Sequence, residues 1–173
     1  GVPPNREVKA IQALTRTTQG DAGNQLRVEL SLWNTGTLPL DSLVARYWFS
    51  VAELSGSTPL IQGPYYSPYG ETVRLVRGNT IPGYSRLPSD IWVAEVAWPG
   101  RSLGAGNQTQ DAGGNSVSFD IHLSNWGSWD RTNDWSRNSS VSWIANDHVT
   151  VHARGVQLWG QSPIQPPAYG PNL

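Results

Sequence analysis

Residues 26–32 read Leu-Arg-Val-Glu-Leu-Ser-Leu, and residues 117–123 read Val-Ser-Phe-Asp-Ile-His-Leu. In both stretches apolar and polar side chains alternate one by one. Successive side chains of a β-strand point to opposite faces, so this period of two predicts strands with one apolar and one polar face. Turn-forming residues bound four further strand-like runs, at 43–51, 71–77, 91–98 and 149–154. The chain is therefore predicted to be all-β, an antiparallel β-sandwich with jelly-roll topology and about nine strands.

Proline-rich ends flank the alternating part of the chain. The 173 residues suit one domain with a packed core. Prolines concentrate in residues 1–5 and 162–173, where they favour extended chain without a core. We predict an N-terminal linker remnant at 1–5, a β-sandwich module at 6–161 and a Pro-rich C-terminal linker at 162–173. Within the module, residues 7–15 fit a helix and an edge strand equally well.

Charge and composition exclude several classes of function. Twelve basic and 13 acidic side chains give a formal charge of −1, and the basic ones are scattered. Nucleic acids and anionic membranes both attract concentrated positive charge, so neither is predicted as a partner. No apolar run approaches the roughly 18–20 residues that span a bilayer. The chain contains no Cys, which excludes disulfides and thiolate chemistry.

Aromatic side chains are enriched and charged ones are scarce. Charged residues make up 14% of the chain, against roughly 25% in an average soluble domain. Nine Trp and six Tyr are present, and three of the Trp fall in the polar, turn-forming stretch 124–136. We expect the Trp126 ring to be exposed as a flat stacking platform. We expect Trp129 and Trp135 to fold back over the sandwich.

Residues 64–70 read Pro-Tyr-Tyr-Ser-Pro-Tyr-Gly and form a second aromatic cluster. Two Pro and a Gly predict a loop here and argue against a central strand. A phenol ring combines an apolar face with a polar edge, which suits sugars that stack through C–H groups and hydrogen-bond through hydroxyls. A loop that caps its own core explains the cluster equally well.

Candidate catalytic groups have no recognisable arrangement. His148 and His152 lie four residues apart, which on a strand is about 13 Å, too far to share one zinc ion at about 2.1 Å. Both are expected on a solvated strand face. No carboxylate pair stands in a catalytic context, and no Gly-x-Ser-x-Gly motif occurs. The chain is therefore predicted not to be an enzyme.

The segments 33–36, 40–50, 125–136 and 149–163, taken in this order, resemble the family 3 carbohydrate-binding modules. These are the cellulose-binding modules of bacterial cellulases and scaffoldins. The resemblance implies a nine-stranded jelly roll with a structural Ca²⁺. It also implies a planar strip of aromatic and polar residues on one sheet that lies flat on crystalline cellulose. Residues 100–115 look longer and richer in Gly than the family usually has there.

The resemblance assigns binding residues position by position. Trp126 takes the place of the strip's Trp, and Asp120 stands where the family has an Arg. The family's Asp-aromatic pair ahead of the strip's Tyr is missing, and Gln62 is the nearest polar residue. The strip's Tyr has three candidates that the alignment does not separate: Tyr65, Tyr66 and Tyr69.

The resemblance also assigns ligands for the structural Ca²⁺. They fall on Ser50, Asp130, Asn133 and Asp134. The remaining carboxylate position holds Ala52, so Glu53 would have to substitute for it. From composition alone, the oxygens of the 130–134 segment suit Ca²⁺ and local Asx-turn hydrogen bonds equally well.

The function predicted on this basis is non-catalytic binding of cellulose or a related β-glucan. Such a module would be secreted and would target an attached glycoside hydrolase or scaffold to its polysaccharide. An alternative keeps the fold but gives up cellulose binding, with the module packing against a neighbouring hydrolase domain to modulate it. The departure at Asp120 and the missing Asp-aromatic pair favour that alternative. A structural or sensory domain on a cell surface is a further interpretation.

Overall fold

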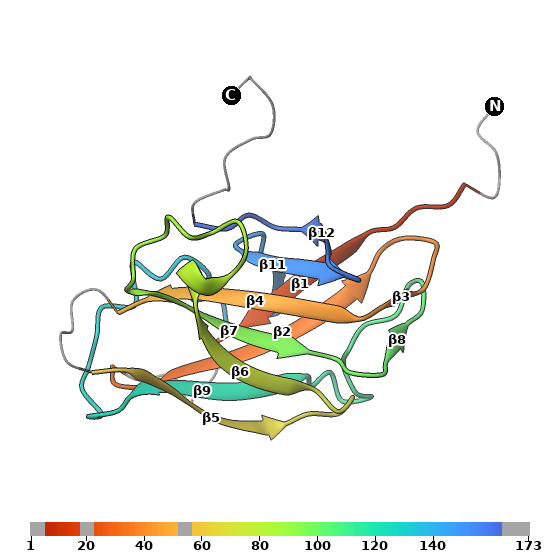
Figure 1. Cartoon of the computed structure of the whole chain (residues 1–173). Helices are drawn as coiled ribbons and strands as arrows, with labels where there is room; N and C mark the ends of the chain where they lie inside the picture. The colour runs from red at the N-terminus through yellow and green to blue at the C-terminus, as the bar shows by residue number, and fades with distance from the viewer. Residues whose placement is uncertain (1–5, 18–22, 52–56, 164–173) are drawn as a thin grey trace.

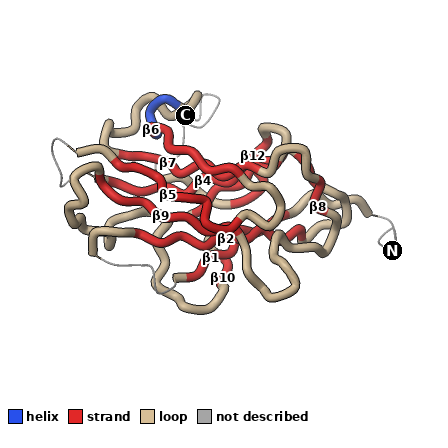
Figure 2. Tube along the Cα trace, turned by 90° about the horizontal axis from the view of Figure 1, so that it is seen from below, coloured by secondary structure: helices blue, strands red, loops and turns tan. Residues whose placement is uncertain are grey.

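The structure, a computed structural model, describes residues 6–17, 23–51 and 57–163. Antiparallel pairing joins its strands into two five-stranded sheets and one two-stranded ribbon. The two sheets face each other as layers (Figure 1). Figure 2 shows loops gathered around both ends of these layers and one short helical segment beside β6. The predicted all-β antiparallel sandwich is confirmed. In the described ranges, no helix is long and apolar enough to cross a membrane.

The first sheet has the strand order β10-β1-β2-β9-β5. Its members are β1 (Ile11–Arg16), β2 (Leu26–Asn34), β5 (Pro59–Tyr66), β9 (Val117–Leu123) and β10 (Ile144–Ala145). The register sets Arg27 of β2 opposite Asp120 of β9, and Asp120 opposite Gln62 of β5. Residues opposite one another share a face of the sheet, so these three side chains lie on the same side.

The second sheet has the strand order β12-β11-β4-β7-β6. Its members are β4 (Leu43–Ser50), β6 (Thr72–Arg77), β7 (Ile91–Ala97), β11 (Val149–Ala153) and β12 (Val156–Trp159). A ribbon of β3 (Leu40–Asp41) and β8 (Ser102–Leu103) closes one end, and the 3₁₀ helix η1 (Gly78–Thr80) follows β6.

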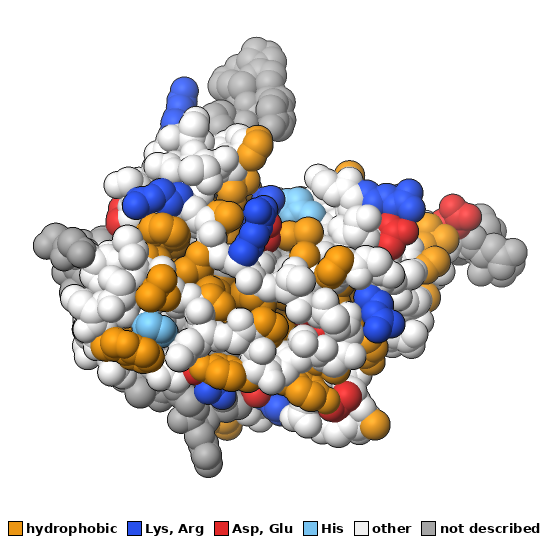
Figure 3. Space-filling view, turned by 60° about the horizontal axis from the view of Figure 1, so that its bottom comes forward, with side chains coloured by type: hydrophobic (Ala, Val, Ile, Leu, Met, Phe, Trp, Pro, Cys, Tyr) orange, Lys and Arg blue, Asp and Glu red, His pale blue; other side chains and the backbone are white. Residues whose placement is uncertain are grey.

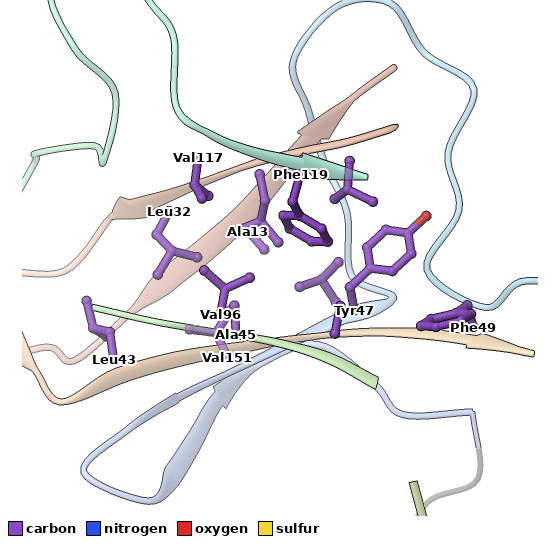
Figure 4. Close-up of a cluster of buried hydrophobic side chains, with 14 of the residues drawn as sticks. Ala13, Leu32, Leu43, Ala45, Tyr47, Phe49, Val96, Val117, Phe119 and Val151 are labelled. Carbon is purple, nitrogen blue, oxygen red and sulfur yellow. The ribbon is translucent and has the colours of Figure 1, made fainter. Parts of the chain in front are cut away.

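The main core fills the space between the two sheets, as the sequence alternation requires. Val117 and Phe119 of β9 face Ala45 and other apolar side chains of the second sheet (Figure 4). Every residue of β9 is buried, including those on its polar face. Other side chains must therefore cover the outer face of β9.

Several local predictions change in the structure. Twelve strands occur among the described residues in place of about nine, because two-residue strands such as β10 give no periodic signal. The ambiguous stretch 7–15 contributes strand β1. Tyr65 and Tyr66, predicted to lie in a loop, end the edge strand β5. Ser162 is buried and so belongs to the module, whereas residues 1–5 and 164–173 lie outside the described ranges.

A second apolar cluster covers part of the outer face of the second sheet. Trp48 and Val93 on that face pack against Tyr84 and its neighbours in the loop after η1. Trp135 packs on the edge of this cluster, and Trp129 is buried in the main core. Both Trp therefore fold back over the sandwich, as expected from the sequence.

His148 and His152 are less exposed than predicted. His148 is half-buried, and its ring stacks on Trp135 with centroids 3.7 Å apart. His152 of β11 is also half-buried, and its Nδ1 has no hydrogen-bond partner among the described residues. Burial, and to a lesser extent the nearby Arg46, lower the pKa of His152 to about 4, while Glu95 opposes the shift.

The depressed pKa of His152 makes stability fall in acid. The unfolded chain takes up a proton near pH 6.5, whereas the folded chain takes it up only near pH 4. Stability is therefore lost as the pH falls from about 6.5 towards 4. We expect the free energy of unfolding to drop by about 1–2 kcal/mol between pH 7 and pH 5, less than full linkage because water screens a half-exposed ring. Urea titrations should show a smaller drop for His152→Leu, and equal drops would contradict the assignment.

Candidate functional site

Trp126 lies just beyond the end of β9 and presents its ring to solvent. The indole is 47% exposed, and its other face stacks on the His122 ring with centroids 3.6 Å apart and an interplanar angle of 5°. His122 is 6% exposed, so the indole covers it. Trp126 has φ of +58°, a left-handed conformation that is unfavourable for a bulky side chain. Such strain is found where a side chain must be held in a particular place.

Arg27 of β2 and Asp120 of β9 form an ion pair beside this stack. Asp120 lies two residues before His122 on β9. The Asp120 carboxylate is fully buried and accepts hydrogen bonds from Arg27 Nε, from Gln25 Nε2 and from Arg27 Nη2, the last at 3.0 Å. The bond to Asp120 raises the pKa of the Arg27 guanidinium. The ion pair therefore supplies a fixed, flat cation on the outer face of the first sheet.

Tyr65 lies over that cation. The Arg27 guanidinium is 4.8 Å from the centroid of the Tyr65 ring, close enough for a cation–π contact. The phenol donates a 3.1 Å hydrogen bond to Gln62 Oε1. Partial burial, with Asp120 nearby, raises the pKa of Tyr65. The ring is 51% exposed, so one side is supported and the other is open to solvent.

Tyr66 stands opposite Ser118 on the same face of the sheet. Its ring is 40% exposed, and its hydroxyl donates to Asp111 Oδ2. That bond raises the pKa of Tyr66 and lowers the pKa of Asp111. A register irregularity in β5 between Gln62 and Tyr66 explains how two successive Tyr can both be exposed, because a bulge breaks strict alternation.

Trp126, Tyr65 and Tyr66 together form what we call the ring row. Each ring lies over or beside one residue of β9: His122, Asp120 and Ser118, respectively. These three residues are spaced two apart, which is about 7 Å per step. Figure 3 shows hydrophobic side chains set at intervals along this part of the surface, with basic and acidic side chains between them. The ring row and its supports are what cover the polar face of β9.

The structure brings most of the predicted binding residues together. Gln62, Tyr65, Tyr66, Asp120 and Trp126 share the outer face of the first sheet. Tyr69 lies apart, because it is half-buried against the core and its hydroxyl donates a 2.8 Å bond to the carbonyl oxygen of Gln110.

The predicted metal ligands meet only in part. Asp134 is buried, and its Oδ1 accepts the Ser50 N–H at 2.9 Å while its Oδ2 accepts Trp129 Nε1 at 3.3 Å. Asp130 is exposed and its Oδ1 accepts two bonds from Thr132, the Asx-turn alternative. Within the described ranges, no group of three or more His, Cys, Asp or Glu side chains could hold a metal ion.

Calcium takes six to eight oxygen ligands. Here the Asp134 carboxylate accepts N–H groups of β4 and of the loop after β9. Asn133 is exposed, and Glu53 lies outside the described residues. The structural Ca²⁺ therefore stays a prediction from the sequence.

Two members of the site are not predicted from the sequence. The alternation of residues 117–123 puts His122 on the polar face of its strand but gives no sign that it supports Trp126. The alternation of residues 26–32 likewise puts Arg27 on the polar face, without marking it as a site residue. From the neighbouring strand, Arg27 supplies a cation beside Asp120, the position at which the resemblance implies an Arg.

An antiparallel sandwich with a supported row of exposed rings over one sheet defines a class, the β-sandwich modules with a flat aromatic docking face. Residues 11–160 match the family model described as "Cellulose binding domain". The chain therefore belongs to this family, the family 3 carbohydrate-binding modules.

Curated relatives are larger proteins that contain a similar segment. The chain is 28% identical over 141 residues to Endoglucanase 5 of Pectobacterium carotovorum, covering 80% of this chain and 26% of that protein. It is 25% identical over 150 residues to cellulosomal-scaffolding protein A of Acetivibrio thermocellus, covering 83% of this chain and 8% of that protein. The chain thus spans about a quarter or less of the length of these two relatives.

Solved structures show the same fold. The carbohydrate-binding module of cellobiohydrolase 9A from Clostridium thermocellum has a TM-score of 0.66 at 18% identity, covering 89% of this chain and 98% of that one. A biomass-sensing module from the same organism has a TM-score of 0.67 at 17% identity, covering 90% of this chain and 100% of that one.

Proposed function

We propose that this module docks its ring row on the surface of cellulose and does not hydrolyse it. The observation that carries the proposal is the alignment of three exposed rings along one sheet face, each fixed by a hydrogen bond, a stacking contact or a cation. Membership in a family described as cellulose-binding supports it.

The physical basis is a surface that needs little rearrangement. Sugar rings present flat C–H faces that stack on aromatic faces, and their hydroxyls hydrogen-bond to polar edges. Because a β-sheet and close contacts already hold the rings, little conformational entropy is lost on binding. Gln62, Arg27 and Asp111 lie between or beside the rings and provide polar groups at the margins.

The module is proposed to act as a targeting part of a longer, secreted protein. Its curated relatives are named as an endoglucanase and a cellulosomal scaffolding protein, and each is several times longer than the matched segment. An appended glycoside hydrolase or scaffold is therefore the proposed partner within the chain.

In the alternative, the module has lost cellulose binding and packs against a hydrolase. Two departures favour it, Asp120 and the missing Asp-aromatic pair. The first carries less weight beside the structure, since Arg27 pairs with Asp120 and supplies a cation under Tyr65. Trp126 and Tyr65 are also left about half exposed, as docking requires.

A binding isotherm on microcrystalline cellulose tests the proposal. We expect saturable depletion of the protein from the supernatant and no release of reducing sugar from soluble β-glucans. Amorphous chitin serves as the control for adhesion to any polysaccharide. Retention of the protein in the supernatant at all cellulose loadings would overturn the proposal, and so would reducing-sugar release that rises with protein concentration.

A further inference from the structure

A cleft of about 370 Å³ opens at the end of the sandwich where β4 begins and β7 ends. We call it the end cleft. Its volume falls within the range of about 300–1,000 Å³ that is typical of small-molecule sites. Much of its wall is built by residues of the segment 101–110, which follows β7 and contains β8.

The aromatic wall of the end cleft is held in place before any ligand arrives. Tyr69 and Trp98 both line it, but Trp98 is buried in the core, so Tyr69 is the ring that a ligand can reach. The Tyr69 hydroxyl bonds the carbonyl oxygen of Gln110, and the carbonyl of Tyr69 accepts a 3.2 Å bond from Arg101 Nε. The Arg101 guanidinium also lies 5.9 Å from the centroid of the Tyr69 ring. A sugar ring that stacks here meets a surface that does not need to be ordered first.

The polar wall carries hydrogen-bonding groups that the protein itself leaves unused. The side chains of Asn107 and Gln108 are exposed, and they make no hydrogen bond to any other described residue. Each side-chain amide offers two donors and one acceptor oxygen. Paired donors and acceptors of this kind match adjacent sugar hydroxyls, which both donate and accept.

Glu71 and Trp98 fix the aromatic wall from the protein side. One Glu71 oxygen, Oε1, accepts the Tyr69 N–H at 2.7 Å, which ties Glu71 to the ring in the cleft. Burial raises the pKa of Glu71, and hydrogen bonds from the backbone and from the Trp98 side chain, together with the charge of Arg101, partly oppose that shift.

We propose that the end cleft binds one or two rings of a soluble oligosaccharide, as a second site separate from the ring row. Its aromatic wall and amide wall provide stacking and hydrogen bonding in a concave site, whereas the ring row suits a flat surface. The two sites adjoin, because Gln110 lines the cleft and the next residue, Asp111, holds Tyr66 of the ring row.

The test is an NMR titration of ¹⁵N-labelled protein with cellotetraose, and with xylotetraose and mannotetraose in separate arms. We expect at least one of the three to shift the side-chain amide signals of Asn107 and Gln108 in a saturable way. The double variant N107A/Q108A should bind that sugar about ten-fold more weakly, the effect of losing two ordinary hydrogen bonds. Gln157→Ala, which removes an exposed amide on β12 at the far edge of the second sheet, should leave the affinity unchanged.

The same titration on Trp126→Ala separates this proposal from the previous one. We expect the cleft shifts to persist in that variant even where retention on cellulose is lost. The end-cleft proposal is overturned if none of the three sugars shifts these signals, if the shifts disappear with Trp126, or if N107A/Q108A binds as well as the wild type. None of those outcomes depends on whether the native protein binds microcrystalline cellulose.

Discussion

Trp126→Ala should weaken binding to microcrystalline cellulose by about thirty-fold or more, which corresponds to about 2 kcal/mol. The reason is that the indole is the largest exposed ring of the row and lies at its end, stacked on His122. Its removal takes away a preformed stacking surface and uncovers a polar imidazole. The measurement is a depletion isotherm at fixed protein concentration and varied cellulose.

A second substitution at the same position separates lost contact from lost folding. Trp126→Gly relieves a left-handed backbone conformation that costs a non-Gly residue about 1–2 kcal/mol, and it gives up a ring stack that contributes about 0.5–1.5 kcal/mol. The two effects offset, so the variant should unfold near the wild-type temperature while binding as poorly as Trp126→Ala. Val156→Ala, an exposed apolar change on β12 of the other sheet, should change neither property. Undiminished cellulose binding by Trp126→Gly would remove the indole from the docking surface.

The fold could be predicted from sequence because its signal is local. Alternation over 26–32 and 117–123 specifies which face of each strand is apolar, and burial of that face requires a second sheet. Strands β3, β8 and β10 were not predicted, since two residues cannot display a period. Residues 64–66, which end the edge strand β5, are predicted as part of a loop because of the prolines at 64 and 68, and an edge position tolerates proline.

Only those members of the site that stand out as single residues could be predicted from the sequence. Trp126 stood out because an indole in a polar turn needs an explanation. The pairing of Arg27 with Asp120 joins positions 93 residues apart, and no local pattern gives that register. The choice among three Tyr was also open, because it depends on the β5 irregularity that turns Tyr65 and Tyr66 outward while Tyr69 packs on the core.

The ion pair beneath Tyr65 should contribute more to stability than any exposed pair in the module. Arg27→Met keeps most of the aliphatic stem but leaves the Asp120 carboxylate buried without its cation. Breaking one side of a buried pair costs about 3–5 kcal/mol. Because the Arg27 side chain is 25% exposed, we expect about 2–4 kcal/mol here, or a fall in Tm of about 5–12 °C. Differential scanning calorimetry measures this directly.

Two further variants show whether the uncompensated charge is the cause. In R27M/D120N the buried side chain is neutral, so the double variant should be more stable than Arg27→Met alone, which simple loss of packing at position 27 does not predict. Arg154→Met breaks an ion pair with Asp41 in which both side chains are well exposed, and it should cost less than about 1 kcal/mol. Equal stabilities for Arg27→Met and R27M/D120N would contradict the assignment. The cellulose binding of R27M/D120N, measured at a temperature where the variant is folded, reports the effect of losing the cation. Tyr65 loses that support but keeps its ring, so we expect binding to weaken, though by less than in Trp126→Ala.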